Sequence, residues 1–189
     1  MVKIECYSNV GRVRKENEDT VLALSFQVSG KPYWVGVVCD GSGGGEDGKY
    51  ASSLVCKSIL DAIDSYEVQG GSVLEDLANL VSYTLNKCNS TIYKKYLGPK
   101  ATVCGTTCSC IILNEKEYIT LHVGDSSIFG VRSCKFDKLT VDHTLTREKV
   151  LQGLITEEEA LTDPSRHTIL RAVGINKHLR VDVSDVKEH

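Results

Sequence analysis

Apolar and polar residues alternate in the first part of the chain with the period of β-strands. Residues 22–28 carry an apolar side chain at every second position, which is the pattern of a strand with one buried face. Residues 33–39 form an almost unbroken apolar run, which is typical of a strand at the centre of a sheet. The Gly-Lys-Pro turn at 30–32 separates the two runs. We therefore expect two neighbouring strands, the second of them central.

Helical spacing replaces this alternation in the middle of the chain. Apolar residues recur every three or four positions over 51–66 and again over 74–92. Two glycines at 70–71 interrupt the pattern, and Ser72 with Glu75 has the spacing of a capping box, so the second helix is expected to begin there.

Strand patterns return in the second half. We expect two hairpins, two short helices and a weak terminal strand, over residues 106–113 with 118–123, 127–132 with 136–140, 146–152, 156–160 and 179–186. Strands, then a helix pair, then strands indicate an α+β fold with helices packed on antiparallel sheet. No repeat, low-complexity tract or linker interrupts the 189 residues, so we expect a single domain over 1–189.

Composition and charge exclude several classes of protein. Hydrophobic residues make up 41% and charged residues 25%, as in ordinary globular proteins. The net charge of −3, without a basic stripe, argues against nucleic-acid binding. No apolar run approaches the roughly 18 residues of a membrane span, and the first nine residues lack the apolar core of a secretion signal. We therefore expect a cytoplasmic protein with neither nucleic acid nor membrane as a partner.

Eight cysteines allow two interpretations. In a reducing cytosol they are free thiols, and most of them lie inside apolar runs, where cysteine behaves as a small core residue. The alternative is a zinc or thiol protein, with Cys104, Cys108, Cys110 and His122 as ligands. The cysteines contain no Cys-x-x-Cys pair, so the spacing favours buried thiols.

The histidines are interpreted as structural. His122 is expected on a strand face and His143 as a cap at the end of the second hairpin. The other three, His167, His178 and His189, are expected at the surface.

Carboxylates and glycines gather where the predicted strands begin or end. Glu18 and Asp19 precede the first strand, Asp40-Gly41 follows the central strand, and Asp125 follows a later one. Mg²⁺ and Mn²⁺ prefer oxygen ligands, and glycine lets a backbone carbonyl approach an ion. Taken singly, each pair is more often a turn or a solvated loop. The glycine-rich run 41–45 has neither phosphate-loop pattern in its proper context.

The order of these segments resembles that of the metal-dependent serine/threonine protein phosphatases, the PPM family or type 2C phosphatases. The matching motifs lie at 11–19, 37–44, 104–107, 122–127, 139–143, 153–156 and 169–174. The resemblance runs from about residue 4 to residue 180, and the short spacings are typical of the compact bacterial branch. It implies an α-β-β-α sandwich of two antiparallel sheets flanked by helices.

The resemblance also implies roles for individual residues. Carried over position by position, they are phosphate binding by Arg14, metal binding by Glu18, Asp40 and the Gly41 carbonyl, orientation of a water by Asp19, and a third, weaker metal site at Asp125. The implied reaction is hydrolysis of phosphoserine and phosphothreonine in proteins by a water that two Mg²⁺ or Mn²⁺ ions activate. Its substrates would be signalling proteins phosphorylated by a serine/threonine kinase.

This sequence departs from the family pattern at three places. Ser42 stands where several members carry a histidine, and Ser127 stands where the motif has arginine. The sequence also ends before the family's Ser-Asp-Gly and Asp-Asn motifs, so we expect roughly the first three-quarters of the domain, truncated at the C-terminus, either as a fragment or as a short form. The alternative function is therefore a non-catalytic pseudophosphatase or regulatory phosphoprotein-binding module. An unpaired sheet edge would favour a dimer.

Overall fold

A six-stranded antiparallel sheet forms the centre of the protein in the computed structural model, which describes residues 2–43, 46–68, 70–96 and 104–189. Its order is β1-β2-β5-β6-β10, and β9 also pairs with β6. The strands are β1 (Thr20–Val28), β2 (Lys31–Cys39), β5 (Cys108–Leu113), β6 (Glu117–Val123), β9 (Asp182–Val183) and β10 (Lys187–Glu188). As expected, β2 lies inside the sheet, between β1 and β5.

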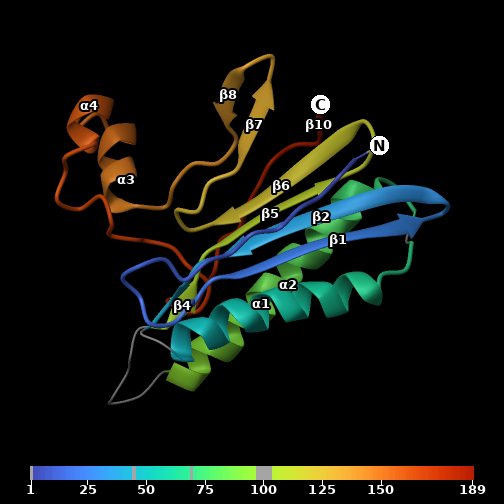
Figure 1. The fold of residues 1–189 in the computed structure, drawn as a ribbon, viewed down its shortest axis with the longest axis horizontal. Helices are drawn as coiled ribbons and strands as arrows, with labels where there is room; N and C mark the ends of the chain where they lie inside the picture. Colours follow the sequence, from blue (N-terminus) through green and yellow to red (C-terminus); the bar gives the residue numbers. More distant parts are fainter. Residues whose placement is uncertain (1, 44–45, 69, 97–103) are drawn as a thin grey trace.

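Two long helices, α1 (Glu46–Asp64) and α2 (Val73–Tyr96), cover one face of the sheet (Figure 1). The core lies between the helix pair and the sheet, because alternate positions of the strands and one stripe of each helix point inward. Val35, Val37 and Ile112 from the sheet and Ile59 and Leu85 from the helices are almost completely buried. Each such side chain contributes about 1.5–3 kcal/mol on burial. Both helices and both predicted hairpins are confirmed.

The remaining elements are short. β3 (Gly41–Ser42) pairs with β4 (Gly105–Thr106), and β7 (Phe129–Arg132) pairs with β8 (Lys135–Lys138). Helices α3 (Leu145–Leu151) and α4 (Glu157–Ala160) lie beyond the end of the sheet at which β2 and β6 finish (Figure 1). Within the described ranges, the strands outside the main sheet therefore form two separate two-stranded sheets.

Two sequence expectations need correction. The strand expected over 179–186 is only the two-residue β9, and β10 follows it without having been predicted. α3 begins at Leu145 rather than 146, because the Thr144 side chain accepts a hydrogen bond from the Arg147 N–H and so caps the helix.

The cysteines are free thiols, of which six are buried and two, Cys6 and Cys134, are exposed. Among the described residues, no three His, Cys, Asp or Glu side chains form a group that could hold a metal ion by themselves, so the zinc alternative finds no support. The described part of the chain also contains no helix with the length and apolarity needed to cross a membrane.

Candidate active site

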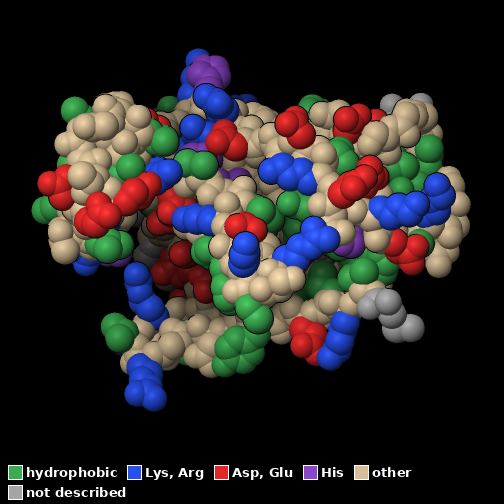
Figure 2. Space-filling model, turned by 90° about the horizontal axis from the view of Figure 1, so that it is seen from above, with side chains coloured by type: hydrophobic (Ala, Val, Ile, Leu, Met, Phe, Trp, Pro, Cys, Tyr) green, Lys and Arg blue, Asp and Glu red, His purple; other side chains and the backbone are tan. Residues whose placement is uncertain are grey.

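The sheet brings four separate segments of the chain to one end. Because the strands are antiparallel, the starts of β1 and β5 lie beside the ends of β2 and β6. A cleft of about 470 Å³ opens there, and Arg14, Glu18, Asp40, Thr107 and Asp125 are among its lining residues. Figure 2 shows acidic side chains gathered in a hollow on the left, at the end where these strand ends lie in Figure 1.

The backbone of Asp40 is fixed by the next strand. Its N–H donates to Thr107 Oγ1 at 2.9 Å, and its carbonyl oxygen accepts from the Thr107 N–H at 2.9 Å and from Thr106 Oγ1 at 3.0 Å. These bonds satisfy the backbone at the point where β2 ends. The Asp40 side chain is therefore held in the cleft while its backbone remains part of the sheet.

The Asp40 carboxyl group is in an environment that disfavours its charge. Partial desolvation comes first, followed by the negative charges of Asp19, Asp125 and Glu18, and together they raise its pKa from 3.8 to about 6. The side chain is exposed to the cleft, so the neighbouring charges reach it through a confined, partly hydrated space. Such a group of oxygens attracts cations.

Because Gly41 and Gly48 have no side chain, Glu18 can approach the loop after Asp40. A Cβ at Gly41 would lie 2.6 Å from the Glu18 carbonyl oxygen and would collide with the Gly48 carbonyl. A Cβ at Gly48 would collide with the Glu18 carboxylate. Glycine is therefore required at Gly41, where an added Cβ would meet backbone atoms, whereas at Gly48 it would displace the Glu18 carboxylate from its present position.

The Glu18-Asp19 turn is anchored to the first turns of α1. Ser52 Oγ donates to the Glu18 carbonyl oxygen at 2.5 Å, and Lys49 Nζ donates to the Asp19 carbonyl oxygen at 2.7 Å. The Asp19 N–H donates to Asn17 Oδ1 at 2.9 Å. These bonds hold the backbone of the turn, while Glu18 lines the cleft and the charge of Asp19 acts on Asp40.

Arg14 lies in the exposed loop that precedes this turn and lines the cleft. Its guanidinium makes no ion pair with any residue that the structure describes. It is thus a cation beside a group of carboxylates, with donors available to an incoming anion.

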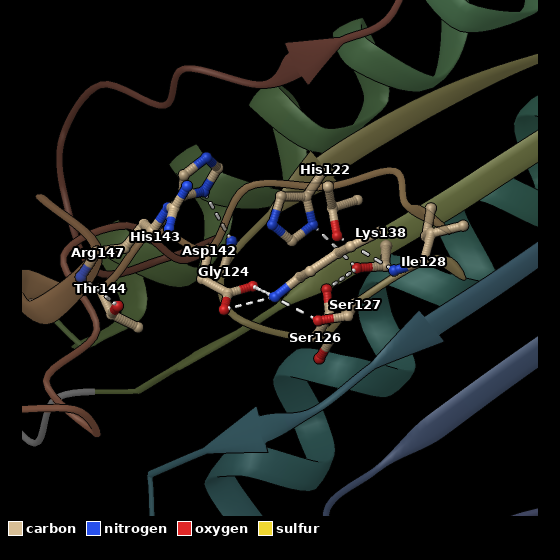
Figure 3. A network of polar contacts seen from close by, with 12 residues as sticks. His122, Gly124, Ser126, Ser127, Ile128, Lys138, Asp142, His143, Thr144 and Arg147 are labelled. Atoms are coloured by element: carbon tan, nitrogen blue, oxygen red, sulfur yellow. Dashed lines mark hydrogen bonds and ion pairs between the residues drawn. The ribbon is translucent and has the colours of Figure 1, made fainter. Parts of the chain in front are cut away.

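A polar network holds the turn that carries Asp125 (Figure 3). The Gly124 N–H donates to His143 Nδ1 at 3.0 Å, and the His143 N–H donates to the Gly124 carbonyl oxygen at 2.8 Å. On the other side, the Ser126 carbonyl oxygen accepts from Ser109 Oγ at 2.6 Å. Asp125 therefore lies between two residues whose backbones are fixed.

These contacts also assign the tautomer of His143. Nδ1 accepts a hydrogen bond, so the proton is on Nε2, which donates to Asp182 Oδ2 at 3.1 Å. Arg171 donates to the other oxygen of Asp182 at 2.6 Å. Burial lowers the pKa of His143, which favours this neutral form. The sequence pattern indicated a structural role for His143 but gave no sign of Arg171 and Asp182.

The structure thus brings the residues singled out from the sequence to one place. Arg14, Glu18, Asp40, Gly41 and Asp125 line the cleft, and the carboxylate of Asp19 lies close enough to act on Asp40. His167 is exposed as expected, but it also lines the cleft, which its position in the sequence did not reveal.

The oxygen donors in the cleft suit a hard divalent cation. Carboxylates and a backbone carbonyl are the ligands that Mg²⁺ and Mn²⁺ prefer, and the repulsion that raises the Asp40 pKa would be relieved by such an ion. Since no three acidic side chains of the described residues enclose an ion alone, carbonyl oxygens and water would complete its coordination.

Comparisons with known proteins agree with this geometry. The chain is similar to the serine/threonine phosphatase Stp of Listeria innocua, with 29% identity over 174 residues that cover 91% of the chain and 67% of the relative. Its fold is similar to that of Stp1 from Staphylococcus aureus, with a TM-score of 0.83, 27% identity, and coverage of 96% of this chain and 69% of that one.

A further solved structure is that of the catalytic domain of the serine/threonine protein phosphatase PstP in complex with two manganese ions. It matches with a TM-score of 0.68 and 28% identity, covering 94% of this chain and 68% of PstP. Residues 12–174 match the family model of protein phosphatase 2C. The α+β fold expected from the sequence is therefore confirmed, and the chain belongs to the protein phosphatase 2C family of metal-dependent serine/threonine phosphatases.

Proposed function

We propose that the cleft at the end of the sheet hydrolyses phosphoserine and phosphothreonine in proteins. The observation that carries this proposal is the meeting of Glu18, Asp19, Asp40 and Asp125 beside Arg14, on strand ends that the sheet holds rigidly. A phosphate ester needs a cationic site that neutralises its oxygens and a water held in line with the leaving oxygen. The residues of the cleft can provide both.

In this proposal Glu18, Asp40 and the Gly41 carbonyl would hold the cations, and Asp125 would belong to a third, weaker site. Bound Mg²⁺ or Mn²⁺ would neutralise phosphoryl charge and lower the pKa of a water molecule. The fixed Asp40 backbone keeps the carboxylate in position without reorganisation. The two manganese ions of the PstP structure support Mn²⁺ as the ion to test first.

Arg14 binds the substrate phosphate, because its planar guanidinium can donate two hydrogen bonds to two phosphoryl oxygens. Asp19 accepts a hydrogen bond from the attacking water and orients it toward phosphorus. Ser42, which lines the cleft, is too weak an acid to protonate the leaving serine or threonine oxygen, so the proton would come from water or from another group of the cleft. No side chain forms a covalent bond with phosphorus, so the cysteines have no part in the reaction.

The test is Mn²⁺-dependent hydrolysis of a phosphothreonine peptide by the full chain. Asp40→Asn should abolish the activity. Asp64→Asn serves as the matched control. Asp64 is an exposed carboxylate at the C-terminal end of α1 and does not line the cleft. Unchanged hydrolysis in Asp40→Asn would refute the proposal.

A second candidate is a module that binds phosphoproteins without hydrolysing them. It is favoured by the incomplete set of acidic ligands among the described residues and by the unpaired guanidinium of Arg14. Folded protein that binds the peptide in an Arg14-dependent manner, with no release of phosphate at saturating Mn²⁺, would support this function over the first.

The same proposal places the protein in the cytoplasm, where it acts in signalling and reverses the work of a serine/threonine kinase that phosphorylates its substrates.

The edge of the main sheet could also support a dimer. β1 pairs only with β2 among the described strands, so its outer edge is available to a second copy. Sedimentation of the full chain would show whether a dimer forms.

A further inference from the structure

The motif around Asp125 lacks its usual cation. The family pattern has arginine at position 127, where this chain has Ser127. The Ser127 side chain is exposed, and its Oγ lies 3.5 Å from Asp142 Oδ1, at the limit of a hydrogen bond. A cation extending from position 127 would therefore face the Asp142 carboxylate.

Instead, a lysine from another strand forms an ion pair with this carboxylate. Lys138, the last residue of β8, donates to Asp142 Oδ1 at 2.6 Å and to Oδ2 at 2.7 Å. Figure 3 shows Lys138 and Ser127 reaching the same carboxylate. The charge that the motif lacks at position 127 is thus present, delivered from eleven residues further along the chain.

The segment that begins at Lys138 is bonded to both ends of the Asp125 turn. Thr140 Oγ1 accepts from the Ile128 N–H at 3.1 Å, and the Leu139 N–H donates to the Ile128 carbonyl oxygen at 2.8 Å. His143 follows Asp142 directly and holds Gly124. Fixing Asp142 therefore fixes the frame in which the turn 124–128 is held.

Lys138 and Asp125 also face the same open space. Both line a second cleft of about 580 Å³, which continues past Asp142 toward α3 and α4. Lys138 thus lies on the wall of a cleft that the Asp125 turn also lines.

We propose that Lys138 is a positioning residue that takes the place of the motif arginine. Its ion pair with Asp142 holds the turn 124–128, and through it Asp125, in the orientation that faces the cleft. This inference rests on the proposed function, because Asp125 as a ligand of the weaker metal site belongs to that proposal. The ion pair is partly exposed, with 37% of the Lys138 and 28% of the Asp142 side chain accessible, so its effect is moderate.

The first test needs no metal. Amide hydrogen exchange of Gly124 and Ile128 reports opening of the turn, because their N–H groups are bonded to His143 and Thr140. In the metal-free chain, Lys138→Ala should speed this exchange about threefold to fivefold. The double variant Ser127→Arg/Lys138→Ala should return it to the wild-type rate, since the arginine supplies the charge from the original position.

Lys135→Ala is the matched control, because Lys135 is an exposed lysine on the same strand with no ion pair among the described residues. It should leave the exchange of both amides unchanged. Exchange that is unaltered in Lys138→Ala would overturn the inference. Exchange that is faster but not restored by Ser127→Arg would also overturn it, since a general loosening of the hairpin would then explain the result.

The second test measures Mn²⁺ binding by calorimetry on the same variants and on Asp125→Asn. Lys138→Ala should weaken the weakest resolved site about threefold to fivefold, with rescue by Ser127→Arg, and Asp125→Asn should abolish that site. If Asp125→Asn weakens Mn²⁺ binding and Lys138→Ala does not, the role of Lys138 is refuted but the metal role of Asp125 is not. An unchanged titration in Asp125→Asn would instead refute the metal role of Asp125 in the proposed function.

Discussion

The two regions that supply the cleft's carboxylates are held by different forces. Glu18 and Asp40 are held by close backbone packing, which depends on the absence of side chains at Gly41 and Gly48. Asp125 is held by a network of histidine, serine and lysine side chains. Packing of this kind tolerates no added atom, although the Asp40 carboxyl group that it positions still titrates, with a pKa of about 6. The network tolerates small changes in shape but depends on protonation and charge.

The largest effect should come from adding one methyl group to the packed region. Gly41→Ala would force the Gly48 backbone and the Glu18 carbonyl apart, at a cost of about 1–3 kcal/mol in unfolding free energy. Activity should be lost, because Glu18 and Asp40 no longer meet.

Urea unfolding and the peptide assay measure both effects. Gly36→Ala is the control, since its Cβ would make only an ordinary contact, at 3.5 Å from Ile111 Cγ2. Equal behaviour of the two variants would show that the glycine packing does not hold the site.

His143→Ala should have the largest effect in the network region. It leaves the Gly124 N–H and the Asp182 carboxylate without their buried partner, which costs about 1–3 kcal/mol. Mn²⁺ binding at the Asp125 site should weaken, while binding at the Asp40 site is retained. His178→Ala, at an exposed position, should change neither the unfolding free energy nor Mn²⁺ binding, both measured by calorimetry. Loss of both metal sites together would contradict the division into two regions.

Acidification should destabilise the network region specifically. Burial lowers the pKa of His122 from 6.5 to about 4, and its Nε2 has no hydrogen-bond partner among the described residues. Between these pKa values the unfolded chain binds a proton that the folded chain does not, so stability falls as the pH falls through this window. From pH 7 to pH 5 the loss attributable to His122 is about 2 kcal/mol.

Urea unfolding at the two pH values measures this loss, with His122→Asn as the comparison. The variant keeps an N–H donor for Ser109 Oγ but has no imidazole to protonate. Its loss between pH 7 and pH 5 should be smaller than that of the wild type. An equal loss would show that another group senses the acid.

The smallest effect is expected from Lys49→Ala. Lys49 Nζ donates to the Asp19 carbonyl oxygen at 2.7 Å, but the contact is exposed and Ser52 still anchors the turn. Stability should change by less than about 1 kcal/mol, and hydrolysis by less than about fivefold on the same scale. A larger loss of activity would mean that this charge acts on the substrate rather than on the turn.

Sequence reasoning succeeded where the signal is local. Period and turn residues located β1, β2 and both long helices, because a buried face imposes its spacing on the chain. β9 and β10 have two residues each, too short for a period to be visible. That residues 1–189 form one domain stays a prediction.

The candidate site was found through the order of short motifs rather than through any single one. Contacts between distant residues were out of reach. Nothing local in Gly48 shows that Glu18 packs against it, and nothing near Asp182 shows that it orients His143. The substitution at Ser127 was visible, but its partner Lys138 became apparent only from distances across the hairpin.

The most direct test of this account is a calorimetric titration of Mn²⁺ into the full chain and into Asp40→Asn, at neutral pH. The wild-type chain should bind Mn²⁺ saturably, Asp40→Asn should lose this binding, and Asp64→Asn should bind as the wild type does. Equal binding by the wild type and Asp40→Asn would contradict the claim that the carboxylates at the end of the sheet form the metal site.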